Sequence, residues 1–80
     1  MPSFTPDLHA LGRAVRAIRE EASLTQVELA AATGLQQTWV SHVEAGRRNP
    51  SWSNIVRLAA GLGVSVSELA VRAEAQARTK

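Results

Sequence analysis

The chain has 80 residues, nine basic against seven acidic side chains and no cysteine, so it is long enough for one small domain and excludes disulfides and thiol catalysis. Its net charge of +2 and pI of 10.5 favour an anionic partner. No apolar run approaches the ~18 residues of a membrane span, and no signal-peptide core opens the chain, so we expect a cytoplasmic protein without a membrane segment. A domain this small has little room for an enclosed catalytic pocket, which favours a binding module over an enzyme.

The first predicted helix spans residues 6–22. Apolar side chains recur along it every three or four residues, which places them on one helix face. Thr5 is a suitable N-cap, followed by Pro6 at the first helical position and Asp7 in the first turn. Residues 1–7 are therefore interpreted as an N-terminal arm and helix cap.

Capping residues mark three further helix starts. Thr25 with Glu28, and Ser65 with Glu68, form the pattern of a capping box, in which a hydroxyl and a carboxylate satisfy free backbone N–H groups. Ser51 is placed to cap another helix. Glycines stand where helices are expected to stop, at Gly34, Gly46, Gly61 and Gly63. The chain is therefore predicted to be all-α, with five helices near residues 6–22, 26–33, 37–45, 52–61 and 66–77.

An enzyme or a metal site is not supported by the sequence. His9 and His42 are the only histidines, and neither has a carboxylate or another histidine at metal-ligand spacing. The Gly61-Leu62-Gly63 segment lacks the third glycine and the preceding strand of a dinucleotide-binding loop, so a helix end explains it better. We expect no catalytic activity, no metal and no cofactor.

The segment from Gln26 to Gly46 has the spacing of a helix-turn-helix. A short capped helix is followed by a turn that opens with Gly34, where a left-handed backbone costs glycine least. Ala30 and Ala31 are small enough to let the second helix cross closely. The second helix has an apolar edge, Val40 and Val43, and a polar outer edge, Gln37, Thr38, Ser41 and His42.

Three stretches carry a family pattern: QVELAAATG from Gln26, WVSHVEAGRRNPS from Trp39 and VRLAAGLGVSVSEL from Val56. Together they resemble the Xre/Cro-type helix-turn-helix family of phage and bacterial repressors over roughly residues 8–70. The resemblance implies a compact five-helix, lambda-repressor-like DNA-binding domain. Residues 71–80 are left as a helical extension or a tail.

The resemblance implies that the second motif helix, residues 37–45, enters the major groove of DNA. Gln37 is expected to read an A·T pair, because its amide can bond adenine through two hydrogen bonds. Gln36 replaces the usual Ser or Thr cap, and either a DNA contact or a tolerated flaw explains it. His42 is either a base reader or an exposed histidine. The predicted base-contacting set is Gln36, Gln37, Thr38, Ser41 and His42.

A second predicted set contacts DNA phosphates. In the family, the glutamine that opens the first motif helix holds a phosphate and braces the recognition helix, and Gln26 occupies that place. Trp39 either donates its indole N–H to a phosphate or packs against the neighbouring helix. Arg47, Arg48 and Asn49 lie on the loop after the recognition helix, where they suit phosphate oxygens, although a solvated charge run is the alternative.

Five residues are expected to be structural or to form an interface. The resemblance pairs Arg19 with Glu44 as a partly buried ion pair that orients the recognition helix. Trp52 stands where the family usually has an aliphatic residue, so we expect it in the core or at its edge. The family commonly dimerises through its last helix, which places Leu69 and Val71 at a dimer interface.

The sequence thus predicts a regulator that binds double-stranded DNA sequence-specifically, most simply a repressor. A homodimer on a palindromic operator is expected, because one recognition helix reads too few base pairs for useful specificity. An antitoxin or another protein-interaction module of the same fold is the alternative. In either case a toxin or RNA polymerase is a candidate protein partner.

Overall fold

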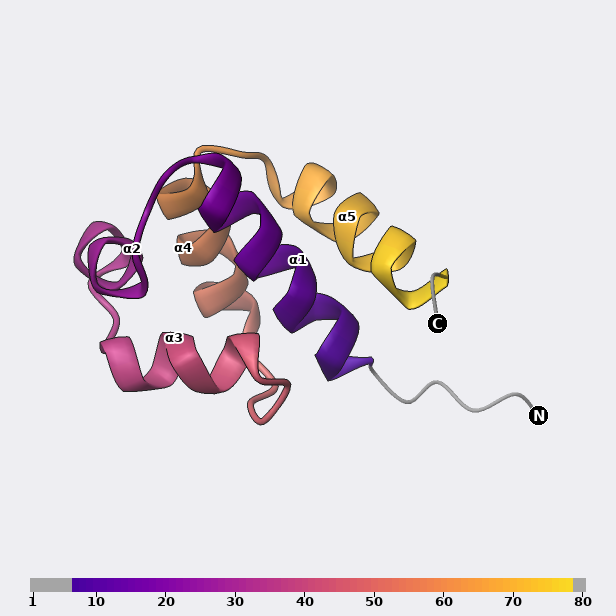
Figure 1. Cartoon of the computed structure of the whole chain (residues 1–80), viewed down its shortest axis with the longest axis horizontal. Helices are drawn as coiled ribbons and strands as arrows, with labels where there is room; N and C mark the ends of the chain where they lie inside the picture. Colours follow the sequence, from indigo (N-terminus) through magenta and orange to yellow (C-terminus); the bar gives the residue numbers. More distant parts are fainter. Residues whose placement is uncertain (1–6, 79–80) are drawn as a thin grey trace.

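The computed structural model describes residues 7–78, and in that range the chain is entirely helical apart from its connections (Figure 1). The helices are α1 (Leu8–Glu21), α2 (Gln26–Thr33), α3 (Gln37–Glu44), α4 (Trp52–Leu62) and α5 (Val66–Arg78). The predicted all-α class and the order of five helices are confirmed.

The start of α1 differs from the prediction. The side chain of Asp7 accepts a hydrogen bond from the backbone N–H of Ala10 at 2.9 Å, so Asp7 is the N-cap and the helix begins at Leu8. The prediction that Asp7 lies inside the first turn is therefore wrong. Thr5 and Pro6 lie outside the described residues. Asp7 competes well for this role because a carboxylate is among the best N-caps and favours the positive end of the helix dipole.

The other predicted helix starts are confirmed. Thr25 and Glu28 form the complete capping box, with the Thr25 hydroxyl 3.0 Å from the Glu28 nitrogen and the Glu28 carboxylate 2.9 Å from the Thr25 nitrogen. Ser51 and Ser65 each accept a hydrogen bond from the backbone N–H three residues later. These bonds satisfy N–H groups that have no partner within their own helix.

Of the four glycines predicted at helix ends, Gly34, Gly46 and Gly63 lie there and Gly61 does not. Gly34 and Gly63 follow α2 and α4 with φ of 73° and 75°, the left-handed conformation that glycine adopts without strain. Gly61 instead lies inside α4 and faces α2, where a Cβ would stand 2.5 Å from Cγ2 of Thr33. Its role is the close packing of two helices.

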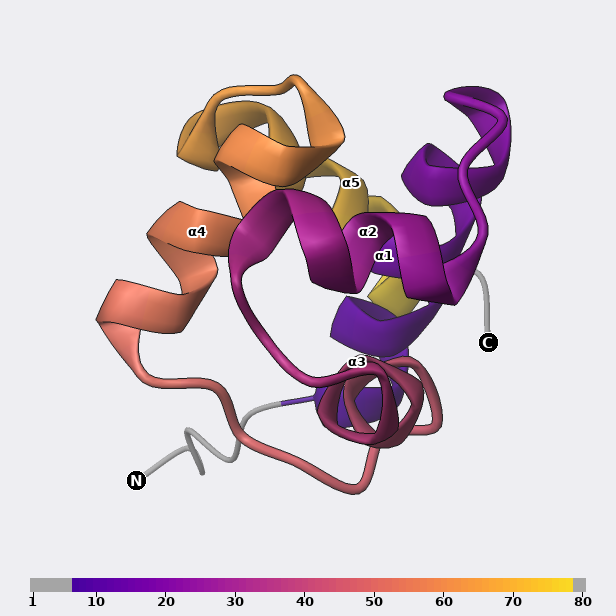
Figure 2. The ribbon, with the colours of Figure 1, turned by 90° about the vertical axis from the view of Figure 1, so that its left-hand side faces the viewer.

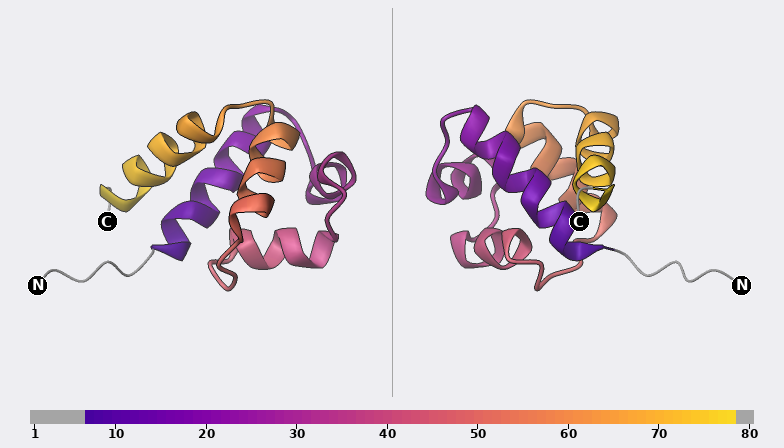
Figure 3. Two further views of the ribbon diagram at one scale, coloured as in Figure 1. Left: turned by 180° about the vertical axis from the view of Figure 1, so that it is seen from behind. Right: turned by 45° about the vertical axis from the view of Figure 1, so that its right-hand side comes forward.

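The core lies where all five helices meet. Of the two alanines predicted to let α3 cross closely, Ala30 is buried in the core and Ala31 is exposed, so Ala31 does not take part in such a contact. Figure 2 shows α3 nearly end-on beneath α2, and Figure 3 shows α1 and α5 side by side. The largest fully buried side chains are Val15, Leu29, Val40, Val43, Leu58 and Leu69.

Helix α5 is fastened along α1 by polar contacts as well as by its apolar face. The two terminal guanidinium nitrogens of Arg72 donate to the carboxylate of Glu21, and the guanidinium of Arg13 donates to the side chain and the backbone of Gln76. The helix continues to Arg78, so the chain beyond residue 70 is helical up to that point.

No single helix among the described residues is long and apolar enough to cross a membrane. Only α4 and α5 taken together meet the length and composition of a span, and the pair is bent by 96°.

Candidate nucleic-acid interface

Helix α3 has one buried and one exposed edge, as the sequence predicted. Val40 and Val43 are buried in the core and hold the helix on the bundle. The predicted base-contacting residues share the other side, where Gln36, Gln37 and Thr38 are exposed and Ser41 and His42 are half-buried. The helix therefore presents its amino-terminal turn to solvent, the part that a recognition helix uses to reach base edges.

Gln36 is the N-cap of α3, and its side chain makes no capping hydrogen bond. This agrees with the expectation that glutamine caps poorly. The helix starts without the ~1 kcal/mol that a good cap contributes.

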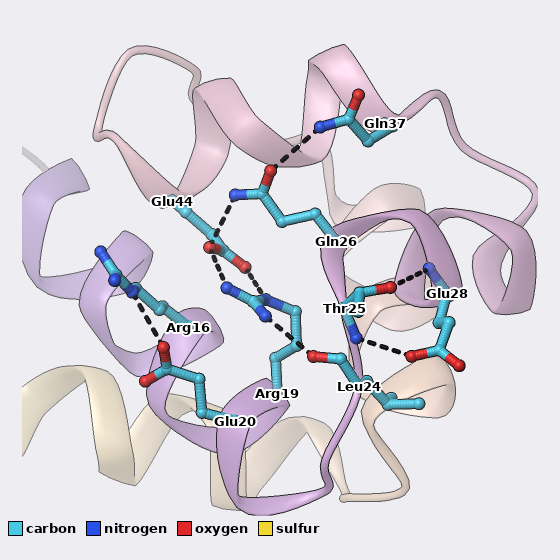
Figure 4. A network of polar contacts seen from close by, with 9 residues as sticks. All are labelled: Arg16, Arg19, Glu20, Leu24, Thr25, Gln26, Glu28, Gln37 and Glu44. Atoms are coloured by element: carbon cyan, nitrogen blue, oxygen red, sulfur yellow. Dashed lines mark hydrogen bonds and ion pairs between the residues drawn. The ribbon is translucent and has the colours of Figure 1, made fainter.

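The predicted ion pair between Arg19 and Glu44 is present (Figure 4). Two guanidinium nitrogens of Arg19 donate to the two carboxylate oxygens of Glu44 at 2.6 and 2.9 Å, and a third donates to the backbone carbonyl of Leu24 at 2.8 Å. The side chains of the pair are only 10% and 5% exposed. The hydrogen bonds to Glu44 raise the pKa of Arg19 above its ordinary value, so its charge is permanent. The pair ties the end of α3 to α1.

Two glutamines extend this ion pair toward the exposed edge of α3. Gln26 donates its amide N–H to Glu44 at 3.0 Å, and its amide oxygen accepts a hydrogen bond from the Gln37 amide at 3.0 Å (Figure 4). The bracing role expected of Gln26 is therefore present. The link to Gln37 was not predicted, because residue types alone do not reveal how two amides 11 positions apart are oriented.

Two glycines that let α1 approach the end of α3 were also missed as site residues. A Cβ on Gly12 would stand 2.5 Å from the backbone oxygens of Val43 and Glu44, so only glycine allows this approach. Gly46 has φ of 76°, and the ring of His9 lies against it, 2.5 Å from where a Cβ would be. A glycine in the middle of α1 was the available signal, since glycine is unfavourable inside a helix unless packing requires it.

The loop after α3 carries the predicted phosphate-contacting residues. Arg47, Arg48 and Asn49 are all exposed, and within residues 7–78 neither arginine forms an ion pair. Trp39 is half-buried and packs against the core. Packing is thus established for Trp39, and its phosphate contact stays a prediction.

Two predicted positions are wrong. Trp52 was expected in the core or at its edge, but it is the first residue of α4 and is 69% exposed. Leu69 was expected at a dimer interface, but it is 1% exposed and belongs to the core of its own chain, so it has no surface left for a partner. Val71 is 61% exposed and remains a prediction. Among the described residues no cluster of His, Cys, Asp or Glu could hold a metal ion.

Comparison with known proteins identifies the family to which this arrangement of helices belongs. Residues 10–71 match the helix-turn-helix domain family. The chain belongs to that family. Among its curated relatives, this helix-turn-helix domain is 39% identical over 59 residues to the immunity repressor protein of Bacillus phage phi105. The match covers 74% of the chain but only 41% of the phage protein.

Solved structures of similar proteins include two restriction-modification controller proteins. C.AhdI from Aeromonas hydrophila superposes with a TM-score of 0.77 and 40% identity, over 79% of this chain and 96% of that one. C.Esp1396I, solved as a tetramer in complex with its natural 35 base-pair operator, superposes with a TM-score of 0.81 and 27% identity, over 94% and 96%. These similarities confirm the resemblance to Xre-like regulators and the helix-turn-helix fold.

Proposed function

We propose that this helix-turn-helix protein is a sequence-specific double-stranded DNA-binding transcriptional regulator that acts in the cytoplasm as a homodimer on a palindromic operator. The observation that carries the proposal is the placement of α3. A buried ion pair and two valines fix the helix, and its polar edge faces outward beside a basic loop whose arginines form no ion pair in the described part of the chain. Relatives named as a repressor and as controller proteins support this function, and repression is the proposed sign of regulation.

Direct base reading is assigned to the exposed edge of α3. One amide N–H of Gln37 is held by Gln26, which leaves its second N–H and its amide oxygen free on the outer side. This pair matches N7 and N6 of adenine, so Gln37 is proposed to read an A·T pair in the major groove. The other proposed base contacts come from Gln36, Thr38, Ser41 and His42.

Phosphate contacts are assigned to the residues that border this edge. Arg47 and Arg48 supply guanidinium groups that form no ion pair within residues 7–78, and Asn49 adds an amide on the same loop. Gln26, at the start of α2, and Trp39, on α3 itself, are proposed to donate to the phosphates on either side of the recognition helix. Such contacts supply most of the affinity but carry no sequence information.

Two copies are required because a single recognition helix contacts only a few base pairs. A two-fold dimer places two such helices in successive major grooves, about 34 Å apart, and reads a palindrome. Occupation of such an operator near a promoter would block access by RNA polymerase.

The deciding experiment is selection of duplexes from a random library by the purified protein at about 150 mM salt, where non-specific phosphate binding is weak. We expect enrichment of a palindrome with half-sites about 10 base pairs apart, centre to centre. A library that shows no enrichment would refute this function and favour a module that needs a toxin or another protein as partner.

A further inference from the structure

The start of α1 lies beside the loop that follows α3 (Figure 1). His9, the second residue of α1, is exposed, and its ring covers Gly46 of that loop. The ring atoms Nδ1, Cε1 and Cγ would stand 2.5, 2.9 and 2.9 Å from a Cβ on Gly46, so the Nε2 edge is the one farther from the loop. An exposed imidazole therefore packs on the backbone from which Arg47 and Arg48 extend.

The backbone of this loop is held in place by the end of α3. The N–H of Gly46 donates to the carbonyl of Val43 at 3.0 Å, and the N–H of Arg47 donates to the carbonyl of His42 at 2.8 Å. These bonds fix the points at which the two arginine side chains leave the loop. Because the ring of His9 rests on the same backbone, its position relative to the proposed phosphate contacts is also fixed.

The charges around His9 are mostly positive. Among the neighbouring carboxylates, Asp7 caps α1 and Glu44 is held in the buried ion pair. Glu74 lines an apolar groove together with Leu11, which points to the opposite side of α1 from His9. No ion pair joins His9 to a carboxylate within residues 7–78. The segments around it carry four guanidinium groups: Arg13 on α1, Arg47 and Arg48 on the loop, and Arg78 at the end of α5.

We propose that His9 is a further contact to the DNA phosphates, and that protonation of its ring strengthens DNA binding as the pH falls. Phosphates follow one another about every 3.4 Å of helix axis along a strand, so a loop that holds one brings the group packed beside it close to the next. A protonated imidazole donates from both nitrogens, and its hydrogen bond to a phosphate is about twice as strong as a neutral one. The inference rests on the proposed function, because it extends the phosphate contacts assigned to Arg47 and Arg48.

The direction of the pH dependence follows from the charge. Imidazole side chains change charge between about pH 5 and pH 8. Because the charged ring binds phosphate more tightly, complex formation takes up protons in this window, and the affinity for DNA falls as the pH rises through it. His42 is the only other histidine and lies on the proposed base-reading edge, so it adds a dependence of its own. The contribution of His9 is therefore the difference between the wild type and variants at His9.

Fluorescence anisotropy with labelled duplexes at pH 6 and pH 8, over a range of salt concentrations, tests the proposal. One duplex is the operator found by library selection, and the other has a random sequence. His9→Phe keeps a ring against Gly46 without the charge. We expect it to lose about threefold to fivefold in affinity for both duplexes at pH 6 and little at pH 8, as an exposed charge pair would. The slope of log affinity against log salt should shrink by up to about one at pH 6 only.

Two further variants separate charge from packing. His9→Lys is charged at both pH values, so it should bind more tightly than the wild type at pH 8 and should lack the pH dependence that His9 supplies. Arg16→Gln is the matched control, because it removes a charge from an exposed position seven residues, or about 10 Å, further along α1. That distance exceeds the ~8 Å over which charges act at physiological salt, so neither the pH profile nor the slope should change.

Circular dichroism and melting temperature check that the variants fold. A pH profile and salt slope that are the same in His9→Phe as in the wild type would overturn this inference and leave the proposed function standing. An equal loss of affinity at both pH values with an unchanged slope would also overturn it, since the ring would then only support the loop. A wild-type chain that binds neither duplex at either pH would refute the proposed function and this inference together.

Discussion

Glu44, at the end of α3, accepts two hydrogen bonds from Arg19 of α1, and both side chains are almost entirely buried. A third bond reaches the same carboxylate from Gln26 of α2. One carboxylate thus sets the angle between the recognition helix and the two helices that support it. Its removal would leave a buried guanidinium without a counter-charge, which costs far more than an exposed ion pair does.

Glu44→Ala is therefore expected to lower the free energy of unfolding by about 3–5 kcal/mol. Glu20→Ala is the matched control, because Glu20 pairs with Arg16 on the exposed side of α1, and its loss should cost about 0.5 kcal/mol or less. Urea unfolding measures both. Equal losses in the two variants would contradict the structural role of the buried pair.

The pair between Glu21 and Arg72 should make stability depend on pH. The hydrogen bonds from Arg72 hold the pKa of Glu21 below its ordinary value of 4.5. A carboxylate whose pKa is lower in the folded state stabilises the protein above the pKa of the unfolded state. That contribution is lost as the pH falls from about 4.5 through the lowered value. Carbon NMR titration of the Glu21 carboxyl should show the low pKa in the wild type and its return toward the ordinary value in Arg72→Met; an unchanged pKa would refute the link.

Gly12→Ala is expected to destabilise the protein by about 1–3 kcal/mol, because the new methyl group would press on backbone carbonyls at the end of α3. Helix propensity alone predicts the opposite sign, since alanine is favoured over glycine inside a helix by roughly 1 kcal/mol. Gly61→Ala is the comparison, because its nearest neighbour is a methyl group of the Thr33 side chain, which can shift more readily. Thermal unfolding should show a larger loss of stability for Gly12→Ala than for Gly61→Ala.

Gln37→Ala should relax the preference for an A·T pair at one position of each half-site, with a loss of discrimination of about 1–3 kcal/mol. The affinity for other positions should change little. Gln26→Ala should weaken the same preference in part, since it frees the Gln37 amide to rotate. Library selection with both variants measures this, and a preference that survives Gln37→Ala would reassign the contact to a neighbour on α3.

Arg47→Ala and Arg48→Ala should behave differently from Gln37→Ala. Each removes a proposed phosphate contact, so affinity should fall for all sequences alike, and the slope of log affinity against log salt should shrink by about one per contact. Arg57→Ala, at an exposed position on α4, is the control and should leave the slope unchanged. A changed base preference with an unchanged slope would show that the loop does not contact the phosphates.

Most of the fold could be predicted from local chemistry. The starts of α2, α4 and α5 followed from hydroxyl and carboxylate caps, because those groups satisfy specific backbone N–H groups whatever the rest of the chain does. The start of α1 was misplaced because Thr5 and Asp7 are both competent caps. Sequence pattern does not decide between two such residues two positions apart.

The site was predicted less completely than the fold. The family resemblance supplied the pair of Arg19 and Glu44, but the hydrogen bond between Gln26 and Gln37 depends on side-chain torsions that residue types do not specify. Trp52 and Leu69 were misjudged for a related reason. A periodic pattern shows which residues are apolar, but whether a neighbouring helix reaches each one depends on how the helices cross.

The inward edge of α3 secures the helix and its outward edge is free of the core, and this separation affects how DNA recognition can change over evolutionary time. The residues that secure the helix, Val40, Val43 and Glu44, face inward, whereas Thr38 and its exposed neighbours take no part in the core. Substitutions on the outward edge should therefore be nearly neutral for folding while altering which bases are recognised. Gln37 is the exception, since exchanging it also releases Gln26. New DNA targets are thus most readily acquired through Thr38 and its neighbours, without prior compensation elsewhere in the molecule.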